Sequence, residues 1–499
     1  MLTRLKVSGF KNLVDVDVRF GPFTCIAGVN GVGKSNLFDA ILFLGGTTEH
    51  SLTESALAVR DSNRRAGDLA GIFHRVGEWQ SHELRFEAEM ILPARGVDDL
   101  GQEVSPSTTF VRYILRLGLR EENSPHGESG RLEVLEESLI PMRKMDAARH
   151  LSFACSQEWK RSVLTGPRRL DLISTEIKDS QTVVQLHQDG RSGRLFTRPA
   201  ASLPRTLLST VQTGEYPTAL LVRREMQSWR LLQLETSSLR SPDEFTAPVH
   251  LSADGSHLPS TLHQLARRAA SNGHGPDEAK ADAVFAGVAN RLAELLEDVR
   301  EVKVDRDEAR QRFTLLIQTR DGTWLPARAL SDGTLRFLAL AVTEFDPRNA
   351  GLICFEEPEN GIHPRRIPVM LRLLRDIAVD TSVPCDEDNP LRQVIINTHS
   401  PSVVMQSPDD ALLIAELVED VLPMTNEPER KTARRFKKLE FGCLEGTWRA
   451  EDRKTARLTG KANLLAYLNP TGAERYERPD WRRVMDRDDL QMLLQFREP

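Results

Sequence analysis

Four short motifs follow one another along this chain, and together they limit the folds it can adopt more than any other feature does. A glycine-rich segment occupies residues 28–35, Leu-Ser-Asp-Gly-Thr occupies 330–334, an apolar run ending in two glutamates occupies 352–357, and Asn-Thr-His-Ser occupies 397–400. Each motif alone could arise by chance. Their order, and their predicted places at strand ends and helix starts, indicate that they build one kind of site.

The first motif matches the phosphate-binding pattern G-x-x-x-x-G-K-[ST], which ends here in Lys34 and Ser35. Apolar residues predict a buried strand over 24–27 and a helix over 37–44, as this motif requires. Backbone N–H groups of such a loop surround phosphate oxygens, and the helix start adds a favourable dipole. We expect Lys34 to bridge the β- and γ-phosphates of ATP and Ser35 to bind Mg²⁺. A glycine turn without a ligand is the alternative. The loop residues expected to bind nucleotide are Gly28, Asn30, Gly31, Gly33, Lys34, Ser35 and Asn36.

The third motif places two carboxylates, Glu356 and Glu357, directly after the apolar run over 352–355. This pattern predicts acids at the carboxyl end of a buried strand, where they are costly unless a cation or a nucleotide offsets their charge. We expect Glu356 to hold Mg²⁺, directly or through water, and Glu357 to polarise the attacking water. An exposed acidic pair after an edge strand is the alternative.

The fourth motif repeats this pattern of an apolar strand, 394–396, followed by polar residues that include His399. We expect His399 to hydrogen-bond the γ-phosphate and so report its presence. A histidine at a strand end is more often a plain surface residue, and only the neighbouring motifs favour a role for this one.

The second motif places Ser331 and Gly333 at the start of a helix predicted by the apolar residues over 335–341. The free N–H groups of a first helical turn form an anion site. Since Lys34 already holds one nucleotide, Ser331 and Gly333 are expected to grip the γ-phosphate bound to another protomer. A simple serine cap of the helix is the alternative.

These residues resemble the ABC-type ATPase heads of the SMC, RecF and OLD-like group of AAA proteins, over roughly 1–60 and 300–425. The resemblance implies an α/β fold, in which a mixed sheet with flanking helices is joined by an antiparallel β subdomain and an inserted helical lid. It also implies ATP and Mg²⁺ as ligands. Residues 5–13 look like the opening strand and turn of those heads, which makes Lys11 and Asn12 candidate nucleotide contacts.

The segment 356–364 is especially similar to compact members of that group found in bacterial anti-phage defence. Two departures are marks of the subtype: Ser-Asp-Gly stands in place of Ser-Gly-Gly, and Glu356 stands where Asp is more usual. The glutamine that links Mg²⁺ to the lobe interface in such heads is unassigned, with Gln80 as a weak candidate.

A chain of 499 residues exceeds one ordinary core. Alternating residues predict strands over 84–90 and 111–117, and apolar spacing predicts helices over 217–234 and 284–296. Helical segments of this length predict a compact lid and leave no room for a long coiled-coil arm. The domains expected are 1–79 and 301–425 for the two halves of the head, 80–149 for the antiparallel subdomain, 150–300 for the helical lid and 426–499 for a basic extension.

Composition agrees with a cytoplasmic protein. Five cysteines are scattered, which argues against a zinc site or a disulfide framework, and no apolar run is long enough to span a membrane. A net charge of −6 gives no general signal for nucleic acid. The basic run over 430–438 is a solvated helix face, a nucleic-acid contact or a contact with an acidic partner. The acidic run over 486–489 suggests a metal-dependent nuclease site, but no upstream glutamate strand supports that interpretation.

Taken together, the motifs favour an ATPase that acts as a switch. ATP would join two heads into a homodimer or higher oligomer, and hydrolysis, with Glu357, His399 and Lys34 as catalytic residues, would release them. The leading hypothesis is the ATPase component of an anti-phage system that controls a separate effector protein. The alternative is a RecF-like ATPase that binds DNA during repair or recombination. A nucleotide-binding subunit of a membrane transporter is a third class, which the large insertion disfavours.

Overall fold

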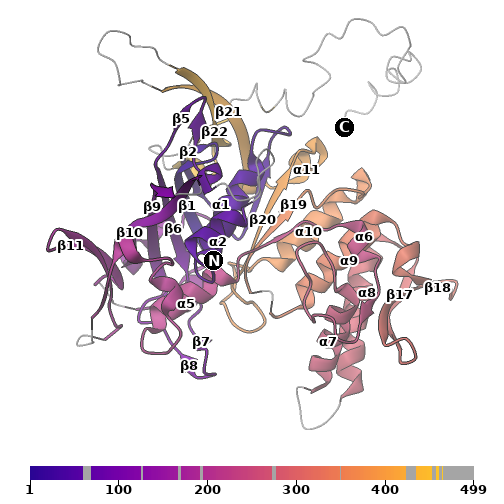
Figure 1. Ribbon diagram of the computed structural model, residues 1–499. Helices are drawn as coiled ribbons and strands as arrows, with labels where there is room; N and C mark the ends of the chain where they lie inside the picture. The colour runs from indigo at the N-terminus through magenta and orange to yellow at the C-terminus, as the bar shows by residue number, and fades with distance from the viewer. Residues whose placement is uncertain are drawn as a thin grey trace, which may run out of the picture. The chain divides into compact units, whose positions relative to one another are not determined.

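The computed structural model of this chain shows two large sheets that share one core around the helix after the phosphate-binding loop (Figure 1). Residues Met1–Thr459 form one compact unit. The structure describes residues 1–59, 69–124, 127–166, 170–190, 195–271, 277–348, 350–422, 434–451, 457–459 and 464.

The first large sheet is antiparallel. Its order is β13-β12-β11-β10-β9-β6-β1-β2, so the two earliest strands lie at one edge. The predicted strands over 84–90 and 111–117 are confirmed as β6 and β9, which pair antiparallel. The strands span Leu2–Phe10 (β1), Leu13–Arg19 (β2), Glu83–Ile91 (β6), Phe110–Ser124 (β9), Gly127–Pro141 (β10), Ile173–Lys178 (β11), Gln181–Leu186 (β12) and Phe196–Pro199 (β13).

The second large sheet carries the sequence motifs. Its order is β14-β19-β20-β3-β21-β22-β23, and the first five strands run parallel. Since the carboxyl ends of parallel strands meet at one edge, the tips of β3, β19 and β20 lie together. The strands span Phe23–Ala27 (β3), Arg230–Leu232 (β14), Gly351–Glu356 (β19), Arg392–Thr398 (β20), Leu412–Leu422 (β21), Arg434–Cys443 (β22) and Arg457–Leu458 (β23).

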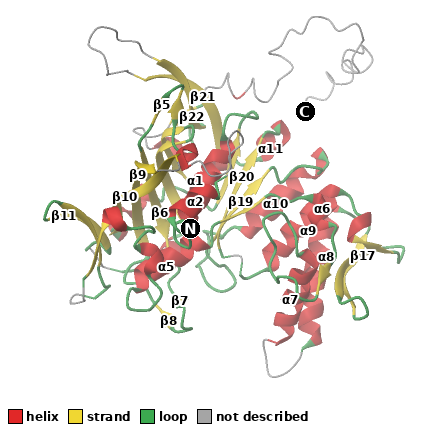
Figure 2. Ribbon diagram, in the orientation of Figure 1, coloured by secondary structure: helices red, strands yellow, loops and turns green. Residues whose placement is uncertain are grey.

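Helices surround these sheets (Figure 2). They span Lys34–Gly46 (α1), Leu52–Leu57 (α2), Ala147–His150 (α3), Gln157–Val163 (α4), Pro217–Gln227 (α5), Thr236–Leu239 (α6), Leu258–Ser271 (α7), Glu278–Leu295 (α8), Asp332–Phe345 (α9), Ile367–Ile377 (α10) and Pro401–Gln406 (α11). Smaller strands pair as β4 (Arg75–Val76) with β5 (Trp79–Gln80) and as β7 (Gly96–Val97) with β8 (Glu103–Val104).

Helix α1 lies in the core, which explains why the phosphate-binding loop is held so firmly. Phe43 of α1 packs on Phe10 of β1 and Phe86 of β6, with ring centroids 5.9 and 5.3 Å apart. Apolar residues of both large sheets belong to the same buried cluster. Full burial of one such aromatic side chain is worth about 1.5–3 kcal/mol. The loop therefore starts a helix whose position both sheets determine.

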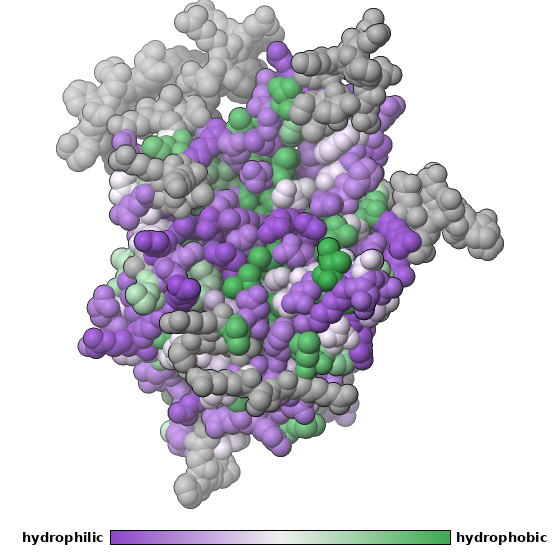
Figure 3. Space-filling model, turned by 90° about the vertical axis from the view of Figure 1, so that its left-hand side faces the viewer, coloured by the Kyte–Doolittle hydropathy of each residue, from purple (hydrophilic) through white to green (hydrophobic). Residues whose placement is uncertain are grey.

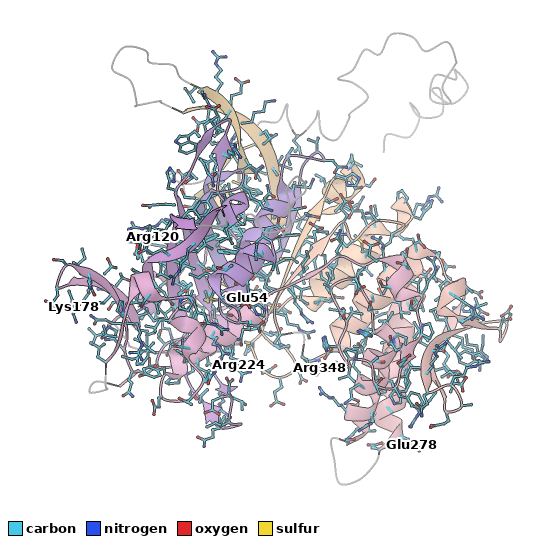
Figure 4. All side chains as sticks on the ribbon, in the orientation of Figure 1. Glu54, Arg120, Lys178, Arg224, Glu278 and Arg348 are labelled. Atoms are coloured by element: carbon cyan, nitrogen blue, oxygen red, sulfur yellow. The ribbon has the colours of Figure 1, made fainter. Side chains whose placement is uncertain are left out.

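The region 150–300 differs in part from the expected helical lid. Helices α7 and α8 lie side by side, and α8 packs on α9 (Figure 1). This region, however, also contains β11, β12 and β13, which extend the antiparallel sheet. A further sheet joins β15 (Asp243–Glu244), β16 (Val299–Asp307), β17 (Arg312–Thr319) and β18 (Trp324–Pro326). In Figure 4, Lys178 marks the end of β11 and Glu278 the start of α8.

The helix predicted over 217–234 is correct only in its first part. Helix α5 ends at Gln227, and the chain then enters β14, which pairs parallel with β19. The apolar residues after Gln227 fit a helix equally well, and only pairing with a distant strand decides between the two. This correction matters because the carboxyl end of β14 reaches the site described below.

The basic segment 430–438 is only partly described, from Arg434 onward. This part forms strand β22, paired antiparallel with β21, so the helix-face interpretation is wrong for it. Lys438 lies 2.8 Å from Asp420 and 3.3 Å from Glu440, so that part of the positive charge is offset within the hairpin. The acidic run 486–489 lies outside the described residues.

The face shown in Figure 3 is mainly hydrophilic, with hydrophobic side chains scattered over it. Isolated exposed apolar residues of this kind are common on protein surfaces. Within the described residues, no helix is both long and apolar enough to cross a membrane.

Candidate functional site

The glycine-rich segment forms a loop between β3 and α1, as the sequence predicts. Gly31 and Gly33 adopt φ angles of 81° and 101°, in a region that favours glycine. A Cβ atom on Gly33 would lie 2.2 Å from the side-chain nitrogen of Asn12. The loop conformation therefore depends on the absence of side chains at these positions, which leaves its N–H groups accessible to an anion.

A cavity of about 530 Å³ opens over this loop and brings together residues from both ends of the chain. The predicted residues that line it are Asn30, Gly31, Gly33, Lys34, Ser35, Asn36, Glu356 and Glu357. The sequence analysis missed six others: Gln233, Leu234, Glu235, Arg336, Asn360 and Asn397.

Lys34 is buried in the floor of this cavity. Its ammonium group donates hydrogen bonds to the carbonyl oxygens of Gly28 at 2.7 Å and Val29 at 3.1 Å. Burial lowers the pKa of Lys34, while the charges of Glu357 and its acidic neighbours oppose that effect. A cation held between backbone carbonyls and a cavity is well placed to move onto a phosphate.

Lys11 and Asn12, the candidate nucleotide contacts from the resemblance, do not line the cavity. The Asn12 amide donates to the carbonyl oxygen of Val32 at 2.8 Å and accepts from Asn36 at 2.8 Å. The Lys11 ammonium lies 2.8 Å from Asp39 of α1. Both side chains thus contact the phosphate-binding loop or its helix.

Glu357 is held by contacts on all sides. Its backbone has φ 46°, a conformation that side-chain-bearing residues seldom adopt, and its N–H donates to the Asn397 side chain at 3.1 Å. One carboxylate oxygen lies 2.6 Å from Nδ1 of His399, and the other accepts from the Asn360 amide at 2.9 Å. Such strain is typical of functional sites. His399 itself is absent from the cavity lining, so it reaches this site through Glu357.

A third acid, Glu359, lies beneath Glu357 and is buried. Burial raises the pKa of its carboxyl group, although a hydrogen bond from the Thr398 hydroxyl opposes the shift. The Ser400 N–H donates to that same hydroxyl at 2.9 Å. The residues after β19 and β20 are therefore tied to one another.

Ser331 and Gly333 lie at the start of α9, and neither lines the cavity that contains Lys34. The Ser331 hydroxyl accepts from the Thr334 N–H at 3.2 Å, so it does serve as a helix cap. A Cβ atom on Gly333 would lie 2.3 Å from the carbonyl oxygen of Gly361. We call Ser331–Gly333 the signature turn. Its backbone consequently packs against the backbone of the loop after Glu357.

Gln233 follows β14 directly and lines the cavity, whereas Gln80 donates to the carbonyl oxygen of Ala70 at 2.9 Å and does not line it. Gln233 thus follows the strand that lies beyond β19 in the sheet, counted from β3, which precedes the phosphate-binding loop. Only three residues, Arg230–Leu232, form the strand before Gln233, which is too short a run to be recognised in the sequence.

Oxygen donors suited to Mg²⁺ gather in this cavity from Ser35, Glu356 and Gln233. Mg²⁺ is commonly held by one or two protein oxygens together with substrate phosphates and water. Among the described residues, no group of three or more His, Cys, Asp or Glu could hold a metal by itself. The residues present therefore fit a metal ion that arrives with a phosphorylated ligand.

Residues 215–405 match a family described as "AAA domain, putative AbiEii toxin, Type IV TA system". A curated relative, the DNA replication and repair protein RecF of Paenarthrobacter aurescens (strain TC1), is 35% identical over 66 residues, which cover 13% of this chain and 16% of that protein. The match thus spans about a sixth of the relative's length.

Solved structures of SMC heads are similar to larger parts of the chain. An Smc head bound to the C-winged helix domain of ScpA has a TM-score of 0.44 and 16% identity, and the match covers 89% of this chain and 98% of that one. A head with an extended coiled coil, from a ScpA complex of Pyrococcus furiosus, has a TM-score of 0.39 and 12% identity, with 87% and 96% covered. The head from Thermotoga maritima has a TM-score of 0.35 and 11% identity, with 87% and 98% covered.

Structural similarities with TM-scores of this size do not establish the fold. The evidence for the fold is the strand order and the arrangement of the site. The parallel strands β14, β19, β20, β3 and β21 place a phosphate-binding loop beside an acidic strand end, and α9 supplies a capped signature turn. The acidic strand and the turn lie within the segment that matches the AAA family. The strand order, the loop and the acidic strand end together fit the α/β fold expected of an ABC-type P-loop ATPase head.

Proposed function

We propose that this chain binds and hydrolyses ATP. The observation that carries the proposal is the single cavity in which Lys34 and Ser35 face Glu356 and Glu357. A cation and loop N–H groups suit the phosphates, and carboxylates at the far wall suit a metal ion and a water molecule. Bound Mg²⁺ would neutralise charge on the phosphates.

In this proposal Glu357 orients and polarises the attacking water. The contacts from His399 and Asn360 fix both carboxylate oxygens, so the group needs little rearrangement to act. Catalysis of phosphoryl transfer consists mainly of positioning and charge stabilisation. His399 would accordingly be a positioning residue for Glu357 as well as the γ-phosphate contact that the sequence predicts.

Two heads would bind face to face, and Ser331 and Gly333 of each would contact the γ-phosphate held by the other. Support comes from their position outside the cavity of their own head and at the free N–H groups of α9. A homodimer or higher oligomer that forms on ATP and separates after hydrolysis would make the protein a switch.

The test measures mass in solution for Glu357→Gln with and without ATP and Mg²⁺. We expect ATP to raise the mass, and we expect Ser331→Arg, added to Glu357→Gln, to prevent the rise. Ser156 caps α4 in the same way that Ser331 caps α9, since its hydroxyl accepts from the Trp159 N–H at 2.9 Å. Ser156→Arg therefore controls for the loss of a helix cap and should leave dimerisation intact. An unchanged mass for Glu357→Gln would contradict the shared site.

We further infer that the switch belongs to an anti-phage system and controls a separately encoded effector. Support comes from the matched family, whose description names a toxin of a type IV toxin–antitoxin system. Cells that carry the chain and its genomic neighbours should resist phage infection, and Lys34→Ala should abolish resistance. Cleavage of DNA by the purified chain alone would count against a separate effector.

RecF-like DNA binding is the alternative, favoured by the 66-residue match to RecF. It requires duplex DNA to bind in the presence of ATP with an affinity that falls steeply with salt, because phosphate contacts release counterions. ATP-dependent binding of this kind without any effector would favour the alternative, and its absence would favour the switch.

A further inference from the structure

Arg336 occupies a place in the cavity that the proposed roles leave unused. It lies on α9, yet it lines the same cavity as Lys34, Ser35 and Glu357. Ser331 caps this helix five residues earlier. Because a helical turn takes about 3.6 residues, Arg336 lies more than one turn along α9 from the Ser331 cap. One helix thus carries Arg336 in the lining of its own cavity and Ser331 outside that lining.

The guanidinium group of Arg336 lacks an acceptor within the described residues. Its Nε atom is buried and has no hydrogen-bond partner among the described residues. Lys34, by contrast, donates to two loop carbonyls. A buried donor without a partner costs about 1–3 kcal/mol, and more when it is charged. The site is therefore incomplete until an oxygen reaches Nε.

Phosphate is the ligand that suits this position. A guanidinium fork binds phosphate oxygens through two parallel N–H groups, which an ammonium cannot do. The acids Glu356 and Glu357 line the same cavity as Arg336 and Lys34. A triphosphate adds further negative charge beside these acids, and a guanidinium at its terminal phosphate would offset part of that charge together with Lys34 and bound Mg²⁺.

We propose that Arg336 binds the terminal phosphate of the nucleotide held by its own head. This inference rests on the proposed ATPase function. It adds a coupling between the nucleotide in a head's own cavity and the signature turn of the same head. Because Arg336 and Ser331 share α9, a γ-phosphate in the head's own cavity positions the signature turn that contacts the partner's nucleotide. Each head would then offer its signature turn in the correct position only when its own cavity holds ATP.

The test compares the affinities of ADP and of the non-hydrolysable analogue AMP-PNP, with Mg²⁺, by titration calorimetry. All variants carry Ser331→Arg, so that contacts across two heads do not contribute. We expect Arg336→Ala to weaken AMP-PNP binding at least tenfold and to change ADP binding less than twofold. Arg336→Lys should give an intermediate loss, since it keeps the charge without the fork. The preserved ADP affinity shows that the variant folds.

The matched control is Arg372→Ala on α10. This arginine side chain is 66% exposed and does not line the cavity that contains Lys34. It should leave both affinities unchanged. Equal losses for ADP and AMP-PNP in Arg336→Ala would show a merely structural role and overturn the inference, as would no loss of AMP-PNP binding. If the parent chain bound neither nucleotide, the ATPase proposal itself would fail.

Discussion

The Nδ1 atom of His399 lies 2.6 Å from Oε1 of Glu357. Because Asn360 donates to the other carboxylate oxygen at 2.9 Å, Glu357 is held between residues from two different strand ends. Its left-handed backbone, with φ 46°, is stabilised by the Asn397 side chain. The carboxylate is therefore fixed before any substrate arrives, and this arrangement makes several results predictable.

Glu357→Gln should lower the rate of ATP hydrolysis about 10²–10⁴-fold, since the amide cannot accept a proton from water. Nucleotide affinity should change little, because Lys34 and the loop hold the phosphates. Steady-state phosphate release and a binding titration measure the two effects. Full hydrolysis in this variant would assign the role to another group.

His399→Ala should slow hydrolysis by about tenfold or more through loss of the contact that orients Glu357. ADP affinity should stay the same, as His399 does not line the cavity. The control is His363→Ala, since His363 caps a short helix through Arg365 outside the cavity. If both histidine variants behaved alike, the Glu357 contact would have no catalytic importance.

Gln233→Ala should raise the Mg²⁺ concentration needed for half-maximal hydrolysis severalfold, because an oxygen donor leaves the metal-facing wall. Gln80→Ala is the matched control, as Gln80 bonds the Ala70 carbonyl away from the cavity. A Mg²⁺ titration of the hydrolysis rate distinguishes them. Greater sensitivity of the Gln80 variant would reverse the assignment.

Gly333→Ala should destabilise the protein by about 1–3 kcal/mol and disturb the signature turn, because the new methyl group would meet the Gly361 carbonyl 2.3 Å away. Gly46→Ala should do the opposite, since its Cβ would meet only ordinary contacts at 3.5 Å and alanine favours the helix. Urea unfolding measures both. A neutral Gly333→Ala would mean that the two loops separate readily.

Glu89 should make stability depend on acid. It is buried, which opposes ionisation, but contacts from His150 and Arg112, both at 2.8 Å, lower its pKa from 4.5 to about 2. The stabilisation is complete above about pH 4.5 and is lost as the pH falls toward 2; it corresponds to about 3 kcal/mol. Urea unfolding at pH 7 and pH 3 should show a smaller pH effect in Glu89→Gln than in Glu83→Gln. Glu83 is the control because its side chain is 60% exposed. Equal pH effects in the two variants would contradict this.

The parts of the site that the sequence predicted are those whose chemistry is local. Lys34 and Ser35 belong to one loop, which the spacing of its glycines alone is almost enough to recognise. Glu356 follows an apolar strand that is long enough to recognise. Gln233 follows a strand of three residues, too short for any periodicity, and β14 exists because β19 lies beside it. Arg336 is one polar residue on a largely buried helix, and nothing in its neighbours along the chain indicates which cavity it faces.

The distinction between local sequence signals and pairing with distant strands also explains which parts of the fold the sequence predicts. Long strands such as β6 and β9 alternate clearly and were predicted, whereas residues 173–199 combine apolar and polar residues with no strong period. The strands within this region form by extending an existing sheet from β10. Lys11 and Asn12 were expected at the nucleotide from the resemblance of residues 5–13 to the opening turn of ABC-type heads, and the structure shows that they contact Asp39 and the Val32 carbonyl.

Strand β3 lies between β20 and β21, both of which come from residues beyond 390. A ribosome that has made only the first half of this protein has therefore produced the phosphate-binding loop. It has not yet produced β20 or β21, the two strands that pair with β3 on either side. A shortened product that ends before β20 should neither hold a nucleotide nor join another head. The proposed nucleotide site is therefore completed only after β20 and β21 have been synthesised.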